Sequence, residues 1–248
     1  DYPLELIESV LRVKGSAYLC DEIMRDEDPR YVQHCLDWDL LSYLPAAEFA
    51  GRRILDFGSG SGASTMVMAR MFKEASFVGI ELEGEHVVLS RQRARHYGLD
   101  SRVEFHRSPT PNGLPDDIGT FDCIVFSAVY EHLLPAERRD VLALLWSHLR
   151  DGGTMFLDQT PYRWFPVELH TTGLPLLNYL PDPIAHRMAC RFSKRIGSNP
   201  TWPELLRMGI RGGTASEVLG LLPAHLGKPM LLEPAERGVR DRIDLWYR

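Results

Sequence analysis

The hydrophobic pattern divides the chain into a regular central part and two less regular flanks. Between about residues 50 and 160, short runs of β-branched and aromatic residues alternate with segments whose apolar residues recur at helical spacing. The strand-like runs are 53–57, 76–81, 102–105, 121–126 and 154–157, and the helix-like segments are 63–72, 85–97 and 135–149. This alternation predicts an α/β fold, a doubly wound and mostly parallel sheet with helices on both faces.

Together with its two flanks, the central part divides the chain into four expected segments. Residues 1–50 look helical and amphipathic, as an N-terminal segment or lid, and precede an α/β core at residues 51–160. Residues 161–203 are rich in proline and aromatic residues without regular periodicity, which is typical of a functional loop or cap. Residues 204–248 are expected to complete the sheet with a terminal antiparallel strand pair. The runs that predict this pair are 229–233 and 241–247.

Composition and charge exclude several classes of protein. The chain has 248 residues, 44% of them apolar, and a net charge of −6, which excludes whole-chain disorder and argues against general nucleic-acid binding. The longest apolar stretches are far shorter than the roughly 20 residues that a bilayer requires, so we expect no membrane span. Four cysteines without a Cys-x-x-Cys pair exclude a disulfide scaffold and a sulfur-rich zinc site. Together with the absence of a signal-peptide pattern, they predict a cytoplasmic protein.

A glycine-rich loop after the first strand is the sharpest chemical signal. Gly58, Gly60 and Gly62 stand at alternate positions directly after a buried strand, so the backbone can turn tightly and approach a ligand closely. The helix that follows aims its free N–H groups at the same place. Asp56 precedes the glycines, and Glu81 ends the next strand, where a carboxylate can accept hydrogen bonds from both hydroxyls of a ribose.

This constellation resembles the class I S-adenosylmethionine-dependent methyltransferases over about residues 50–160. Residues 121–125 are similar to the family's fourth strand and residues 149–153 to its turn into the fifth. The resemblance implies a Rossmann-like fold, S-adenosyl-L-methionine as cofactor and methyl transfer. The cofactor-binding residues that it implies are Asp56, Gly58, Gly60, Gly62, Glu81, Leu82 and Ser127. In one departure, residues 105–110 lack the carboxylate with which family members often contact adenine.

Two other functions are compatible with parts of this pattern. Gly58, Gly60 and Ala63 also satisfy the Gly-x-Gly-x-x-Gly/Ala pattern of a nicotinamide-dependent oxidoreductase. A carboxylate at Asp56 would repel a pyrophosphate, however, and suits a cofactor with an amino-acid moiety. A non-catalytic protein that binds S-adenosylmethionine as a scaffold is the other alternative, because a fold alone does not prove activity.

Candidate catalytic residues follow the fourth and fifth strands, since ligands of parallel sheets bind beyond the carboxyl ends of the strands. His132, beside Glu131, and His170 in the cap are candidate general bases for a hydroxyl acceptor. Tyr162 and Arg163 are candidate substrate-binding residues. The expected acceptor is a small molecule or a glycan, methylated on oxygen or less readily on nitrogen.

We expect no metal site from the sequence. Gln159 and Thr160 stand where metal-dependent catechol-type enzymes carry Asp and Asn, and only Asp158, one position away, keeps metal binding possible.

Two groups of basic residues stand at regular spacing along the chain. Arg187, Arg191 and Arg195 recur every four residues and predict one basic helical face. This face is either solvated or a weak contact with an anionic substrate or membrane surface. The other group, on the segment 85–97, is expected to face solvent. It consists of Arg91, Arg93, Arg95 and His96.

Overall fold

The computed structural model describes residues 2–28, 30–197 and 199–234, which fold into two compact units. The first, called the sheet unit, comprises residues 2–28, 30–126, 147–156 and 231–234. The second, called the cap unit, comprises residues 127–146, 157–197 and 199–230. None of the described helices is long and apolar enough to cross a membrane.

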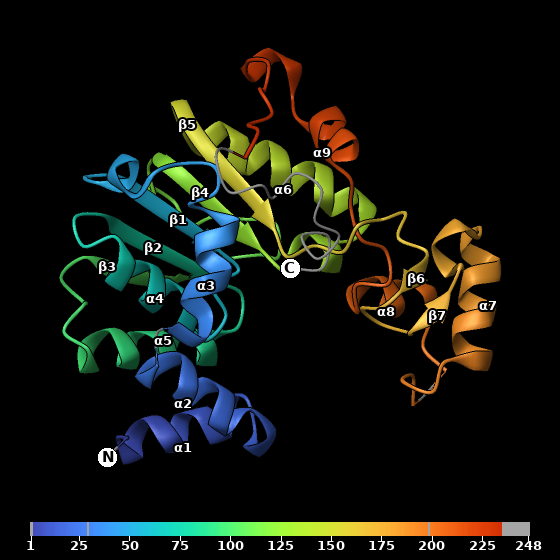
Figure 1. The fold of residues 1–248 in the computed structure, drawn as a ribbon, viewed down its shortest axis with the longest axis horizontal. Helices are drawn as coiled ribbons and strands as arrows, with labels where there is room; N and C mark the ends of the chain where they lie inside the picture. The colour runs from blue at the N-terminus through green and yellow to red at the C-terminus, as the bar shows by residue number, and fades with distance from the viewer. Residues whose placement is uncertain (1, 29, 198, 235–248) are drawn as a thin grey trace. The chain divides into compact units, whose positions relative to one another are not determined.

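The sheet unit is built on a five-stranded sheet, drawn in Figure 1. Its strands are β1 (Arg53–Phe57), β2 (Ser76–Glu81), β3 (Val103–Arg107), β4 (Phe121–Ser127) and β5 (Leu149–Asp158). They lie in the order β3-β2-β1-β4-β5. β1 runs parallel to both of its neighbours, with Ile54 opposite Phe77 on β2 and Cys123 on β4. The predicted α/β, mostly parallel fold is confirmed.

The N-terminal helices of the sheet unit form a layer over the helices that contact the sheet. α4 (Ala63–Met71) and α5 (Gly84–His96) pack against each other and against β2. α1 (Leu4–Val13) packs on α5, while α2 (Leu19–Glu27) and α3 (Arg30–Asp39) pack on α4, as Figure 1 shows. α4 is therefore covered on two sides, which explains why six of its nine residues are buried. The helical character predicted for residues 1–50 is confirmed.

The cap unit contains more regular structure than its sequence predicts. Its helices are most of α6 (Pro135–His148), then α7 (Asp182–Phe192), α8 (Trp202–Arg207) and α9 (Ala215–Leu221). Two short strands, β6 (Val167–Glu168) and β7 (Leu174–Pro175), form an antiparallel pair. A small apolar core holds these parts together. It is built on Leu177, Ala185, Ala189, Leu205, Leu206 and Ile210.

Three expectations, two about the flanks and one about the helix α5, need correction. The run 229–233 forms no strand, and among the described residues nothing after β5 joins the sheet; the run 241–247 lies outside the described residues. The antiparallel pair that exists is β6–β7. The basic face also ends early, because α7 stops at Phe192 and Arg195 instead donates a hydrogen bond to the carbonyl of Leu169. Arg93, expected in solvent, is fully buried.

Candidate functional site

The glycine loop between β1 and α4 has the backbone that its sequence predicts. Gly58, Gly60 and Gly62 all have positive φ angles, at 79°, 54° and 77°. A Cβ on Gly62 would lie 2.7 Å from the hydroxyl of Ser90, so packing requires a glycine there. A Cβ on Gly60 would meet no atom within 4 Å. Gly60 therefore borders open space, which leaves room for a ligand against the loop backbone.

Glu81 is held at the carboxyl end of β2, facing the glycine loop. One carboxylate oxygen accepts the N–H of Gly60 at 2.8 Å, and the other accepts the N–H groups of Leu82 and Glu83 at 2.7 and 3.0 Å. Since a carboxylate offers about four lone-pair positions, this one keeps acceptor capacity for a ligand hydroxyl. The next side chain, Leu82, is 37% exposed and offers an apolar surface beside it.

Asp56 is a buried carboxylate near the end of β1. Burial raises its pKa to about 6; the hydrogen bond from the hydroxyl of Thr65, at 2.5 Å, lowers the pKa, and the negative charge of Glu81 raises it. A buried carboxylate without a neighbouring cation is stabilised by any positive group that binds beside it. The site thus favours a ligand with an ammonium group.

A buried ion cluster, which the sequence did not predict, contacts the glycine loop at Ser61. The guanidinium of Arg93 donates to Asp26 at 2.8 Å, to Glu22 at 2.6 Å and to the carbonyl of Ser61 at 2.6 Å. The hydroxyl of Ser61 also donates to Glu22. The cluster links α2 and α5 to the glycine loop. Only the four-residue spacing of Glu22 and Asp26, which puts both on one face of α2, hinted at it.

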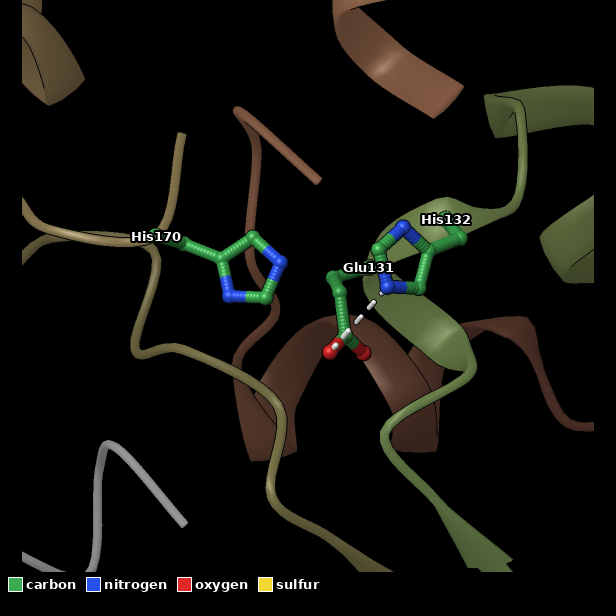
Figure 2. Close-up of side chains that lie close together, drawn as sticks. All are labelled: Glu131, His132 and His170. Carbon is green, nitrogen blue, oxygen red and sulfur yellow. Dashed lines mark ion pairs between the residues drawn. The ribbon is translucent and has the colours of Figure 1, made fainter. Parts of the chain in front are cut away.

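A second polar cluster lies entirely within the cap unit. Glu131 and His132 belong to the single 3-10 turn Tyr130–His132, and His170 lies on the turn between β6 and β7. One ligand atom of each residue lies within 4.8 Å of the others, and Figure 2 shows the two imidazole rings on either side of the Glu131 carboxylate. The structure thus brings together the two histidines that the sequence singled out.

Hydrogen bonds fix the orientation of this cluster. The Nδ1 atom of His132 lies 2.8 Å from the carbonyl of Arg207, which can only accept, so Nδ1 carries the hydrogen. The other nitrogen, Nε2, lies 3.8 Å from Oε1 of Glu131. The hydroxyl of Thr160 donates to Oε2 of Glu131 at 3.0 Å.

The turn that carries His170 is rigidly supported. The buried carboxylate of Glu168 accepts the N–H groups of Thr171 and Thr172, at 2.9 and 2.6 Å, and the hydroxyl of Thr172. On another side, Gly209 approaches so closely that a Cβ there would lie 2.7 Å from Nε2 of His170. A side chain larger than glycine at position 209 would therefore displace the imidazole.

The remaining candidates have contacts within the cap unit. Arg163 donates to the carbonyl of Asn178 and lies over the ring of Trp164, 4.3 Å from its centroid, and burial lowers its pKa to about 10. Tyr162 forms a β-bridge with Gly213. Ser127 is the last residue of β4 and is half-buried.

Comparison with known proteins identifies the central part of the chain. Residues 54–153 match the methyltransferase domain family. The mitochondrial ubiquinone biosynthesis O-methyltransferase of Bos taurus is 27% identical over 139 residues, which are 54% of this chain and 35% of that protein. The release factor glutamine methyltransferase of Agrobacterium fabrum is 32% identical over 139 residues, 50% of this chain and 44% of that protein.

Solved structures give a similar picture at lower identity. The glycopeptide N-methyltransferase MtfA complexed with S-adenosyl-L-methionine is 20% identical, with a TM-score of 0.41 over 47% of this chain and 48% of that chain. The chain spans about a third of the length of the first curated relatives that it matches. The family match, the glycine loop and the sheet order together show that the chain contains a class I S-adenosylmethionine-dependent methyltransferase domain.

Proposed function

We propose that the chain is an S-adenosylmethionine-dependent methyltransferase that acts on an oxygen, or less readily a nitrogen, of a small-molecule or glycan-type acceptor. The observation that carries the proposal is the glycine loop: Gly60 borders open space, and Glu81 is held against it with acceptor capacity to spare. The oxygen acceptor is supported by similarity to an O-methyltransferase of ubiquinone biosynthesis.

In this proposal the residues of the sheet unit bind the cofactor. Glu81 accepts a hydrogen bond from a ribose hydroxyl with its remaining lone pair, and Leu82 packs against the adenine. Asp56 provides the negative charge that balances the ammonium group of the methionine moiety, which also lowers the pKa of this buried carboxyl. When bound, S-adenosyl-L-methionine supplies a methyl group activated by a positively charged sulfur.

The acceptor hydroxyl has to lose a proton as its oxygen gains the methyl group. We assign this proton to His170 or His132, because an imidazole is the side chain suited to general-base work near neutral pH. Tyr162 and Arg163 are proposed to contact the substrate. The aromatic surface beside them, Trp164, is 47% exposed and packs against Tyr179.

The first test is calorimetric titration of the purified chain with S-adenosylhomocysteine, with NADH in parallel. We expect micromolar binding of S-adenosylhomocysteine alone. The variant Gly60→Ala should bind at least ten-fold more weakly, because its methyl group enters the open space beside the loop.

Gly98→Ala is the matched control for this variant. Gly98 also has a positive φ, 63°, with nothing within 4 Å of a Cβ, so both variants carry the same backbone cost of about 1–2 kcal/mol. Only Gly60→Ala should lose affinity. Binding of NADH instead, or of neither ligand, would contradict the proposed cofactor.

A further inference from the structure

We propose that Glu131, His132 and His170 bind one divalent transition-metal ion, of the Zn²⁺ or Mn²⁺ kind. The site lies within the cap unit, and the inference does not depend on the proposed methyl transfer. It also replaces the expectation of a metal-free protein, which rested on the residues around Asp158 rather than on this cluster.

The cluster holds a buried carboxylate oxygen opposite an imidazole nitrogen, with no hydrogen bond between the two atoms. Oε1 of Glu131 is buried and has no hydrogen-bond partner among the described residues, although the side chain is fully buried. The atom facing it is Nε2 of His132, which bears a lone pair in the neutral ring because the hydrogen is on Nδ1. A buried acceptor without a donor is costly, and a cation between the two atoms removes that cost.

The spacing between Oε1 of Glu131 and Nε2 of His132 fits a shared metal ion. The separation of 3.8 Å between Oε1 and Nε2 is too long for a hydrogen bond. Two atoms that each contact the same zinc ion at about 2.1 Å lie at most about 4.2 Å apart, so one ion spans this gap. The third ligand atom, on the exposed His170 ring, lies within 4.8 Å of the other two, so a spacing at that limit has to shorten to about 4.2 Å for one ion to contact all three.

The groups that hydrogen-bond to His132 and Glu131 also resemble those around metal ligands. Metal-ligating histidines usually donate their other N–H to a carbonyl or carboxylate, and ligating carboxylates are themselves hydrogen-bonded. His132 donates to the carbonyl of Arg207, and Glu131 accepts from Thr160. Arg207 is in turn paired with Glu137, 2.6 Å from one of its oxygens, which fixes the position of the supporting carbonyl.

The donor set selects the class of ion. Two imidazoles and one carboxylate suit Zn²⁺, Mn²⁺ and similar ions, whereas Mg²⁺ and Ca²⁺ prefer oxygen ligands throughout. Three protein ligands leave at least one position open, as in catalytic rather than structural zinc sites. An ion there would act as a Lewis acid on an oxygen-bearing ligand. Because an imidazole lone pair bound to a metal cannot accept a proton, this role would replace the general-base role of both histidines.

The test is metal titration of the full, tag-free chain after dialysis against a chelator. Calorimetry with ZnCl₂ and MnCl₂ should give one ion per chain, and bound Co²⁺ should show the visible absorption of a nitrogen- and oxygen-ligated ion. Glu131→Gln and His170→Asn should each lower the affinity at least ten-fold. Thr160→Val should lower it about ten-fold, because it removes a contact that only orients the carboxylate.

The matched control is His225→Asn, since His225 is an exposed histidine on the turn Ala224–Leu226, remote in sequence from the cluster. Its affinity should equal that of the unchanged chain. Thermal unfolding in chelator verifies that each variant is folded. The proposal is overturned if the unchanged chain binds no ion at micromolar concentration, or if Glu131→Gln and His170→Asn bind as tightly as His225→Asn. Neither readout requires S-adenosylmethionine, so a failure here leaves the proposed cofactor untouched.

Discussion

The two polar clusters of this protein solve the problem of a buried carboxylate in opposite ways. In the sheet unit, Glu22 and Asp26 are buried, and the guanidinium of Arg93 donates a hydrogen bond to each of them. In the cap unit, Glu131 is equally buried, yet the described residues place no guanidinium or ammonium group beside its Oε1, only Nε2 of His132 at 3.8 Å. A cluster that contains its own cation holds a fold together. A cluster that lacks one is suited to bind a cation from solution.

The largest expected effect comes from removing the cation of the first cluster. Arg93→Met leaves two buried carboxylates without their partner, so we expect the free energy of unfolding to fall by about 3–5 kcal/mol. Urea unfolding followed by circular dichroism measures this. Arg95→Met, an exposed position on the same helix, is the control and should stay within about 0.5 kcal/mol of the unchanged chain. Equal stabilities of the two variants would show that the cluster contributes no structural stability.

Asp56 is intermediate between the two clusters, because its buried carboxylate accepts a hydrogen bond from Thr65 but contacts no cation among the described residues. Its pKa in the folded protein, about 6, is above the usual 3.8, so the folded state binds the proton more tightly than the unfolded state. The stability contributed by this proton is present below about pH 4 and is lost as the pH rises through about 6. Two pKa units correspond to about 3 kcal/mol at most.

The variant Asp56→Asn removes this dependence. Between pH 4 and pH 8 the unchanged chain should lose about 2–3 kcal/mol of unfolding free energy that the variant keeps. The variant should also bind S-adenosylhomocysteine more weakly. Chemical unfolding at a series of pH values measures the first effect, and calorimetry the second. Asp116→Asn, at an exposed position, should run parallel to the unchanged chain. If the unfolding free energy of Asp56→Asn also followed that of the unchanged chain across the pH range, the pKa of Asp56 would not be raised in the folded protein.

Local sequence signals predicted the parts of the site that depend on local geometry. The positive φ angles of the glycine loop and the position of Glu81 at a strand end follow from short segments of chain. The burial of Arg93 does not, because it depends on Asp26, 67 residues away in the sequence. Likewise, strands of two residues are too short to leave an alternating pattern, so the β6–β7 turn that brings His170 to Glu131 could not be anticipated.

The smallest expected effect is the change in stability caused by Glu131→Gln without metal, and it distinguishes the two clusters. In chelator, Glu131→Gln should leave the free energy of unfolding unchanged or raise it by about 1 kcal/mol. The amide oxygen still accepts the hydrogen bond from Thr160, and the substitution replaces a buried carboxylate, one of whose oxygens has no hydrogen-bond partner among the described residues. With zinc at about 100 times the dissociation constant of the unchanged chain, that chain should gain about 2.7 kcal/mol and the variant, which binds at least ten-fold more weakly, at most about 1.4 kcal/mol. Thermal unfolding with and without zinc measures both. A loss of several kcal/mol in chelator would place Glu131 in the same class as Glu22, as a carboxylate that the fold already satisfies, and the contrast between the clusters would disappear.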